Sequence, residues 1–150
     1  MQTIAEIMTK DVVTVKTETT LREIAVIFDE RRFGSLPVTD NSGKLIGIVT
    51  ASDLIEQGRS LHIPTVISLF DWVIPLESEK SLERELHKMT AQTVGEILTT
   101  EVVTVSSTEP VSKAADVMSY HKLHALPVVD NGTLVGIISR IDIIRNLIKK

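Results

Sequence analysis

The chain contains two copies of one sequence pattern, and this duplication constrains its fold more than any other feature. Residues 4–55 and 94–144 align with a single one-residue gap, and 19 of the 51 aligned pairs are identical. Because one short repeat rarely buries its own apolar face, two copies predict two subdomains that close on each other around a pseudo-two-fold axis. Such an axis creates paired, equivalent clefts, where we expect the functional residues to lie.

The composition is that of a folded globular protein rather than a disordered one, with 43% hydrophobic and 24% charged residues in 150. The net charge of −4 argues against nucleic acid or an anionic membrane as a direct partner. The absence of cysteine excludes disulfides, thiol catalysis and thiolate metal sites. No signal peptide is visible, and the apolar runs near residues 66–76 are too short to span a membrane. We therefore expect a cytoplasmic protein.

The hydrophobic period changes several times within the first repeat, which is typical of mixed helix and strand structure. The β-branched run 12–15 predicts a strand. The capping box Thr20-x-x-Glu23 precedes an amphipathic helical pattern. Strands are predicted at 36–39 and 45–50, and the Asp-Asn-Ser-Gly turn between them makes the pair antiparallel. A helix from about 52 to 56 closes the repeat.

The second repeat carries the same elements in the same order. Its first helix is predicted to start near Pro110, a residue favoured in the first turn. Its hairpin turn is Asp-Asn-Gly at 130–132, and its closing helix runs from about Ile141 to the end of the chain. Each repeat is therefore predicted to be a β-α-β-β-α unit, which makes the fold class α+β.

Three segments follow from the alignment: a first repeat at 1–56, an insertion at 57–93 and a second repeat at 94–150. Within the insertion, 77–90 has the pattern of a polar-rich helix, and 63–76 is strongly apolar. The apolar segment either packs over the core of its own chain or covers a dimer or partner surface, because a long apolar loop is rarely left in water.

These motifs together resemble the CBS domain, and two in tandem resemble a CBS pair, or Bateman module. The resemblance rests on a Thr-Val strand, an amphipathic helix, Leu-Pro-Val-x-Asp, a turn and Gly-Ile-Val-Thr-x-x-Asp, which occur twice in the same order. It implies two β-α-β-β-α units packed with pseudo-two-fold symmetry through their sheets, with clefts for AMP, ADP, ATP or S-adenosylmethionine. It also implies a regulatory sensor rather than an enzyme, and assembly into dimers. The 37-residue insertion departs from the usual shorter linker.

A hydroxyl and a carboxylate recur at the start of each closing helix, as Thr50 with Asp53 and as Ser139 with Asp142. A carboxylate can accept hydrogen bonds from both vicinal hydroxyls of a ribose, and its charge strengthens those bonds. The hydroxyl and the first amides of the helix can meet a phosphate. The same residues are also favoured helix caps. The two roles can coexist.

The resemblance further implies that each cleft is built crosswise, from the hydroxyl–carboxylate motif of one repeat and two segments of the other. Backbone groups of the first strand would pair with the adenine edge, while Val and Pro side chains hold the ring or, alternatively, belong to the core. Cleft one would comprise Asp11, Val12, Val13, Gly34, Ser35, Pro37, Ser139, Arg140 and Asp142. Cleft two would comprise Glu101, Val102, Val103, His124, Ala125, Pro127, Thr50 and Asp53.

A phosphate requires local positive charge, which the sequence offers unequally to the two clefts. Arg31-Arg32 and His121-Lys122 end the first helix of each repeat, where basic residues also complement the helix dipole. Arg140 is the better candidate because a guanidinium can grip oxygens bidentately. Ala51 stands at its position in the first repeat. Cleft one is therefore predicted to suit a charged nucleotide better.

Our leading hypothesis is a non-catalytic sensor module whose regulatory ligand is an adenine nucleotide, with no required cofactor. It is expected to form a homodimer and to act on an unidentified regulated protein. The alternative is a structural or protein–protein adaptor with vestigial clefts that uses 63–76 as its interface. The histidines lack the spacing of a metal site, and no phosphate-binding glycine loop or nucleophile elbow is present.

Overall fold

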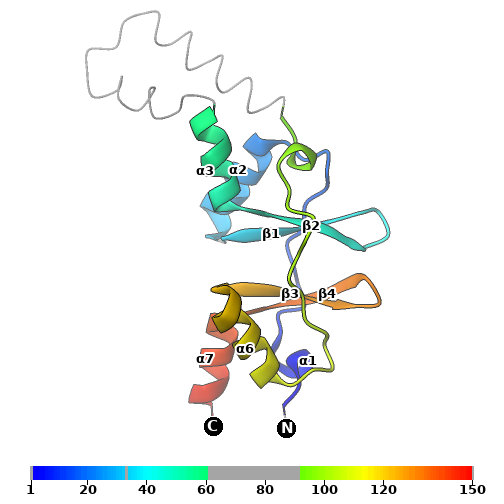
Figure 1. Ribbon diagram of the computed structural model, residues 1–150, viewed down its shortest axis with the longest axis vertical. Coiled ribbons are helices and arrows are strands. Elements are labelled where there is room, and N and C mark those ends of the chain that lie inside the picture. The colour runs from blue at the N-terminus through cyan, green and yellow to red at the C-terminus, as the bar shows by residue number, and fades with distance from the viewer. Residues whose placement is uncertain (1, 33, 61–91, 150) are drawn as a thin grey trace, which may run out of the picture. The chain divides into compact units, whose positions relative to one another are not determined.

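The computed structural model describes residues 2–32, 34–60 and 92–149. Each repeat contributes one hairpin flanked by two longer helices, and a short helical segment precedes them in the chain (Figure 1). In chain order they are α1 (Ile4–Ile7), α2 (Leu21–Arg31), β1 (Ser35–Thr39), β2 (Leu45–Thr50), α3 (Ala51–Ser60), the 3₁₀ helix η1 (Val94–Glu96), α6 (Val111–His121), β3 (Ala125–Asp130), β4 (Thr133–Ser139) and α7 (Arg140–Ile148). The predicted helix 77–90 and the apolar segment 63–76 lie outside the described residues.

The two predicted hairpins are confirmed as separate two-stranded sheets, β1–β2 and β3–β4. In the second hairpin Asp130 pairs with Thr133, so Asn131 and Gly132 form a two-residue loop. Both loop residues have positive φ, 53° and 81°, as a type I′ turn requires. The register shifts between Val128 and Val129, where a bulge interrupts the pairing. Mixed helix and strand content with two small antiparallel sheets confirms the α+β class.

The predicted first strands are shorter than the sequence pattern suggested. Residues 102–104 are in no strand, and only Val105 pairs, by a parallel bridge to Val128. In this bridge the Val105 amide donates to Pro127 O at 3.2 Å, and the Val129 amide donates to Val105 O at 2.8 Å. A turn at 107–108 then carries the chain away, which limits the pairing to one residue. Residues 12–14 are likewise outside any strand.

The helices begin with the caps that the sequence predicts, although some ends differ. The Thr20 hydroxyl accepts from the Glu23 amide at 3.1 Å at the start of α2. Pro110 is the residue before α6 rather than part of its first turn. The closing helix of the first repeat is longer than predicted, since α3 continues to Ser60, while α7 begins one residue earlier than predicted and ends at Ile148.

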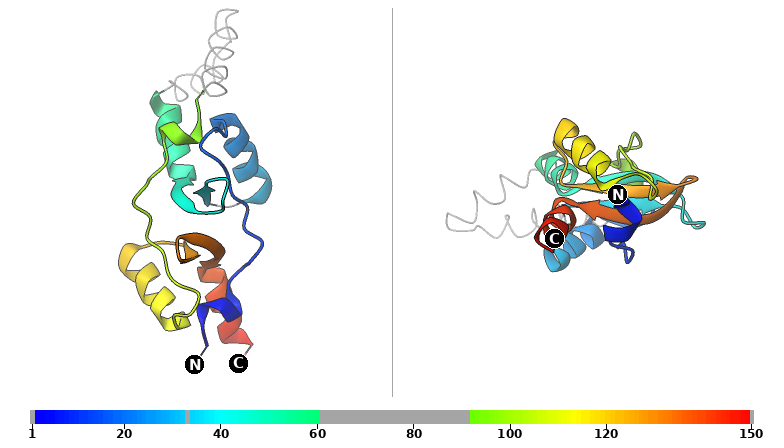
Figure 2. Two further views of the ribbon diagram at one scale, coloured as in Figure 1. Left: turned by 90° about the vertical axis from the view of Figure 1, so that its right-hand side faces the viewer. Right: turned by 90° about the horizontal axis from the view of Figure 1, so that it is seen from below.

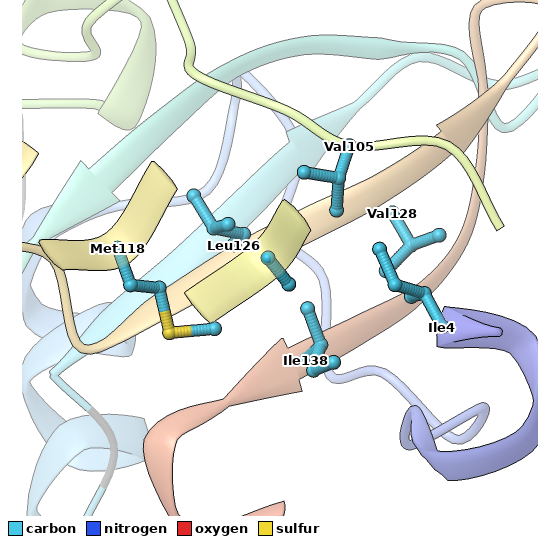
Figure 3. Packing of buried hydrophobic residues seen from close by; sticks show 7 residues of the cluster. Ile4, Val105, Met118, Leu126, Val128 and Ile138 are labelled. Carbon is cyan, nitrogen blue, oxygen red and sulfur yellow. The ribbon is translucent and has the colours of Figure 1, made fainter. Parts of the chain in front are cut away.

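The chain folds into two compact units, and neither coincides with a repeat. Among the described residues, unit 1 takes 2–14, 37–47 and 100–149, and unit 2 takes 15–36, 48–60 and 92–99. The core of unit 1 combines one residue of the first repeat with six of the second, as Figure 3 shows. These residues are Ile4, Val105, Ala114, Met118, Leu126, Val128 and Ile138. In unit 2 the buried hydrophobic residues are Val15, Leu21, Ile24, Leu36, Val49 and Val94.

The repeats exchange their N-terminal segments. In unit 1, α1 of the first repeat donates two backbone hydrogen bonds to the second, from Ile4 to Glu109 O and from Ala5 to Ser107 O, both 2.9 Å long. In unit 2, the matching bonds run from Val94 to Thr19 O at 2.8 Å and from Gly95 to Thr17 O at 2.9 Å. Each short helical segment therefore packs against the body of the other repeat.

The described helices include none that is long and apolar enough to cross a bilayer.

Candidate functional site

Both hydroxyl–carboxylate motifs form helix caps. At the start of α7, Asp142 Oδ2 accepts from the Ser139 amide at 2.9 Å and from the Ser139 hydroxyl at 3.0 Å. At the start of α3, Asp53 Oδ2 accepts from the Thr50 amide at 2.9 Å, while Thr50 Oγ1 accepts from the Asp53 amide at 3.1 Å. All the bonds to either carboxylate use one oxygen. Within the described part of the chain, Oδ1 of each aspartate has no hydrogen bond and is available to a ligand.

The segment before each Leu-Pro is hydrogen-bonded to the closing helix of its own repeat. The Arg140 amide donates to His124 O at 2.9 Å, and the Ala51 amide donates to Gly34 O at 3.0 Å. The Arg140 side chain continues the first of these contacts, because its Nε donates to Leu123 O at 3.1 Å. The guanidinium that was predicted to bind phosphate is thus held beside the end of α6, with its terminal nitrogens exposed.

The N-terminal segment of each repeat pairs with a hairpin strand of the other repeat, just before the predicted site residues. Thr9 and Ile137 exchange two backbone hydrogen bonds of 2.8 and 2.9 Å in unit 1. Thr99 and Ile48 exchange two of 2.9 Å in unit 2. In sequence, Asp11 and Glu101 follow two residues later, and both side chains are exposed.

The valines and prolines of the predicted clefts differ in exposure. The side chains of Val12, Val13 and Val102 are half-buried. Val103 packs on the core of unit 1, so its side chain is structural. Pro37 and Pro127 are fully buried. Of the remaining predicted residues, Ser35 and Ala125 are half-buried, and Gly34 and His124 are exposed.

One of the predicted residues lines a pocket that lies wholly within unit 1. The pocket has a volume of about 370 Å³ and is formed by Gln2, α1, one face of α7 and Lys149 just after α7. Figures 1 and 2 show α1 and α7 side by side near the two chain ends. The lining residues are Gln2, Glu6, Ile7, Asp142, Arg145, Asn146 and Lys149. Asp142 is therefore both the cap of α7 and part of a pocket wall.

Two of the lining residues form an amide pair that joins the N-terminal segment to α7. Gln2 Nε2 donates to Asn146 Oδ1 at 3.0 Å, and Asn146 Nδ2 donates back to Gln2 Oε1. In unit 2, Gln57 Nε2 donates to Gln92 Oε1 at 3.2 Å at the aligned positions. The same local structure is therefore built twice, once from each exchanged segment.

Comparison with known proteins agrees with the repeated architecture. The family model described as CBS domain matches residues 4–59 and again residues 94–149, which together cover most of the chain. The chain belongs to the CBS domain family. CBS-pair proteins are generally regulatory rather than catalytic.

Relatives and solved structures of the CBS family match nearly the whole chain. A CBS domain-containing protein of Dictyostelium discoideum is 30% identical, over 97% of this chain and 91% of that protein. The structure of CBSX2 in complex with AMP, a protein of Arabidopsis thaliana, covers 99% of this chain and 98% of its own, with 24% identity and a TM-score of 0.74. The CBS domain pair of protein MJ0100, in complex with 5′-methylthioadenosine and S-adenosyl-L-methionine, covers 100% and 99%, with 26% identity and a TM-score of 0.70.

Sequence reasoning missed most of the pocket lining of this CBS pair. Arg145, Asn146 and Lys149 follow Asp142 at intervals of three, four and seven residues, which places all four on one face of a helix. This row of polar side chains could have indicated a binding surface. The sequence prediction covered only the first turn of the C-terminal helix. Gln2 and Glu6 gave no signal, because their approach to α7 depends on the exchange of N-terminal segments.

No group of three His, Asp or Glu side chains suited to a metal ion occurs within 2–32, 34–60 and 92–149.

Proposed function

We propose that this CBS pair is a regulatory module that binds an adenosine-containing ligand, of the class of AMP, ADP, ATP or S-adenosylmethionine, and has no catalytic activity of its own. The observation that carries the proposal is the position of Asp142, which lines a 370 Å³ pocket of unit 1 with one carboxylate oxygen not used for capping. The similar CBS pairs crystallised with AMP, 5′-methylthioadenosine and S-adenosyl-L-methionine support this ligand class.

The proposed role of Asp142 is to accept hydrogen bonds from the vicinal hydroxyls of a ribose. An ionised acceptor makes such bonds roughly twice as strong as neutral ones. The cap fixes the carboxylate, because the Ser139 amide and hydroxyl hold Oδ2 and leave Oδ1 free to face a ligand. Asp53 is proposed to act in the same way in the first repeat, since it has the same cap.

The remaining residues of the two clefts predicted from the sequence stay part of this proposal. Backbone groups at 11–13 and 101–103 would recognise the adenine edge, and residues 34–37 and 124–127 would flank it. Arg140 would reach a phosphate with its terminal nitrogens, because its Nε is occupied by Leu123 O.

Regulation requires that ligand binding change what a partner contacts. A ligand shifts a conformational equilibrium only by its differential affinity for the two shapes. We infer that the module works in the cytoplasm as a homodimer, and that ligand occupancy alters its contact with a regulated protein. Of the seven exposed large hydrophobic side chains among the described residues, four lie on α7, which offers such a contact.

A thermal-unfolding screen of the full chain against AMP, ADP, ATP and S-adenosylmethionine tests the proposal. A ligand at 100 times its Kd stabilises the fold by about 2.7 kcal/mol, so the unfolding midpoint should rise by several degrees. GMP serves as the control for the adenine base, and it should give a smaller shift. If none of the adenosine compounds moves the midpoint, the adaptor function is favoured and the sensor function is rejected.

A further inference from the structure

The pocket of unit 1 carries two acidic and two basic side chains, and the two signs lie at different positions along it. Glu6 and Asp142 are in the first turns of α1 and α7. Arg145 and Lys149 follow Asp142 on the same face of α7. At a rise of about 1.5 Å per residue, they lie roughly 4 and 10 Å further along the helix axis. The pocket is therefore acidic at the start of α7 and basic toward its end.

The carboxylates of the two acidic residues already accept hydrogen bonds from the protein, whereas the two basic side chains have no partner within the described residues. Asp142 Oδ2 accepts from the Ser139 amide, and Glu6 Oε2 accepts from the Thr3 amide at 2.9 Å. Within the described part of the chain, neither Arg145 nor Lys149 has a side-chain hydrogen bond or ion pair, and both are exposed. A ligand with an anionic group would supply the missing counter-charge at this end of the pocket.

At the aligned positions of the other repeat, the two acidic residues are also acidic, but neither of the two basic residues has a basic counterpart. Glu96 aligns with Glu6, Asp53 with Asp142, and the Gln92–Gln57 amide bond with the Gln2–Asn146 pair. Glu56, however, stands at the position of Arg145, and Ser60 stands at the position of Lys149. Two acids and two bases in one set thus correspond to three acids and no base in the other. Because the shared residues build the same local structure, the difference concerns charge.

We infer that Arg145 and Lys149 bind the anionic tail of the ligand, and that the ligand site around Asp142 therefore selects nucleotides over neutral nucleosides. This inference rests on the proposed function, because it places the ribose hydroxyls at Asp142. The tail then runs along α7 toward Arg145 and Lys149, which take the place of Arg140 as the phosphate contacts of this site. The site around Asp53 lacks these cations and takes adenosine compounds without an anionic tail.

Isothermal titration of the full chain with AMP and with adenosine measures how much the phosphate contributes to the affinity. In the wild-type protein, AMP should bind to one site per chain at least about tenfold more tightly than adenosine. Arg145→Glu gives this position the charge of its counterpart Glu56 and should remove that preference, while it leaves adenosine affinity within about twofold. Lys149→Ala should reduce the preference less, because Lys149 lies further along the helix. Higher salt should weaken AMP binding and not adenosine binding.

Lys113→Glu on the exposed side of α6 is the matched control, since it changes net charge by the same amount outside the pocket. It should leave both affinities within about twofold. Circular dichroism verifies folding, and Arg145→Ala replaces Arg145→Glu if the reversed charge unfolds the chain. An unchanged AMP-to-adenosine ratio in the Arg145 variant overturns the inference and leaves the proposed function intact. Wild-type protein that binds neither compound overturns the inference, and the proposed function is rejected as well if ADP, ATP and S-adenosylmethionine also fail to bind.

Discussion

At the scale of single residues, Asp142 and Asp53 combine an observed structural role, helix capping, with a proposed ligand-binding role. The repeated hydroxyl–carboxylate spacing was enough to predict both caps, because capping depends only on residues three apart in sequence. The cap itself leaves one carboxylate oxygen free, but the residues that surround Asp142 come from the N-terminal segment and from α7 beyond its first turn. The sequence pattern therefore predicted Asp142 as a site residue but not its neighbours Arg145 and Lys149.

Asp142→Asn should weaken AMP binding by roughly tenfold while it changes stability little, because an amide oxygen still accepts from Ser139 but carries no charge. Asp53→Asn is the matched variant in the first repeat, and it should affect AMP binding less. Titration calorimetry gives the affinities, and urea unfolding gives the stabilities. Equal losses of AMP affinity in the two variants would show that the sites do not differ.

The aligned aspartates Asp40 and Asp130 are bonded differently although both follow Leu-Pro-Val. Asp130 accepts from the Ser106 hydroxyl at 3.0 Å and from the amide and hydroxyl of Ser107, which tie the end of β3 to the preceding segment. The bonds that Asp40 accepts include those from the Ser42 hydroxyl at 2.7 Å and from the Lys44 amide at 3.0 Å, both donors in its own turn. The extra residue Ser42 supplies local donors, so sequence identity at this position did not predict identical bonding.

These hydrogen bonds make stability depend on pH in the acid range. The Ser107 hydroxyl and amide lower the pKa of Asp130 below 3.8, and the Ser42 hydroxyl and Lys44 amide lower the pKa of Asp40 in the same way. A carboxyl whose pKa is lower in the folded state stabilises the fold above its unfolded pKa. That contribution should be lost as the pH falls from about 3.8 through the folded pKa.

Asp130→Asn should therefore lower the free energy of unfolding at pH 7 and make it fall less steeply below pH 4. Asp116→Asn, an exposed position on α6, should follow the wild-type curve. Urea unfolding between pH 7 and pH 3 measures both. A wild-type slope below pH 4 in Asp130→Asn would mean that other groups control the acid transition.

At the scale of elements, the hairpins and main helices could be predicted from the sequence because their signals are local. Asn131 and Gly132 specify their own turn, and the Thr20 cap fixes the start of α2. The run at 102–105 was predicted as a strand, although most of it is not one. β-branched residues favour extended backbone whether or not a partner strand lies beside them. Its single bridge to Val128 depends on tertiary contacts that no local pattern records.

The exchanged segment of the first repeat lies very close to β4 at Gly136. A side-chain carbon placed there would lie 2.6 Å from Met8 Sδ and 3.0 Å from Thr9 O. The methionine side chain can move, but the Thr9 carbonyl is held by its pairing with Ile137. Glycine at this position therefore permits the close approach of the two segments.

Gly136→Ala should destabilise the fold by about 1–3 kcal/mol, the usual cost of overpacking. Gly34→Ala is the matched control, because a side-chain carbon at Gly34 meets nothing within 4 Å. Denaturant unfolding of both variants measures the difference. A Gly136 variant as stable as the Gly34 variant would show that the segment moves aside without cost.

At the scale of the whole molecule, α7 carries an apolar side that its own unit does not cover. Ile144, Leu147 and Ile148 are 49%, 64% and 78% exposed. Exposed apolar groups of this size commonly mark contact surfaces. The predicted homodimer would bury this face. The repeat alignment did not predict this apolar face of α7. Within the described residues, Ile55, which aligns with Ile144, is the only α3 counterpart with comparable exposure.

Leu147→Glu should convert the predicted dimer to a monomer or weaken it at least about tenfold, since burying an unpaired charge in an apolar contact is costly. Tyr120→Glu, at an 83% exposed position on α6, is the control. Light scattering coupled to size-exclusion chromatography measures the mass of each variant. A wild-type protein that is monomeric at all concentrations would refute the dimer, and a dimeric Leu147 variant would move the interface elsewhere.

The exchange of N-terminal segments makes the two halves of the gene product interdependent. A polypeptide ending at residue 60 would lack the segment 92–95 that is hydrogen-bonded to Thr17, Thr19 and Leu21, and one starting at residue 92 would lack the segment that completes the core around Ile138. Neither half should therefore fold when expressed alone, whereas the two halves expressed together should assemble without a covalent link. Split complementation of this kind would let the protein report the proximity of two fused tags.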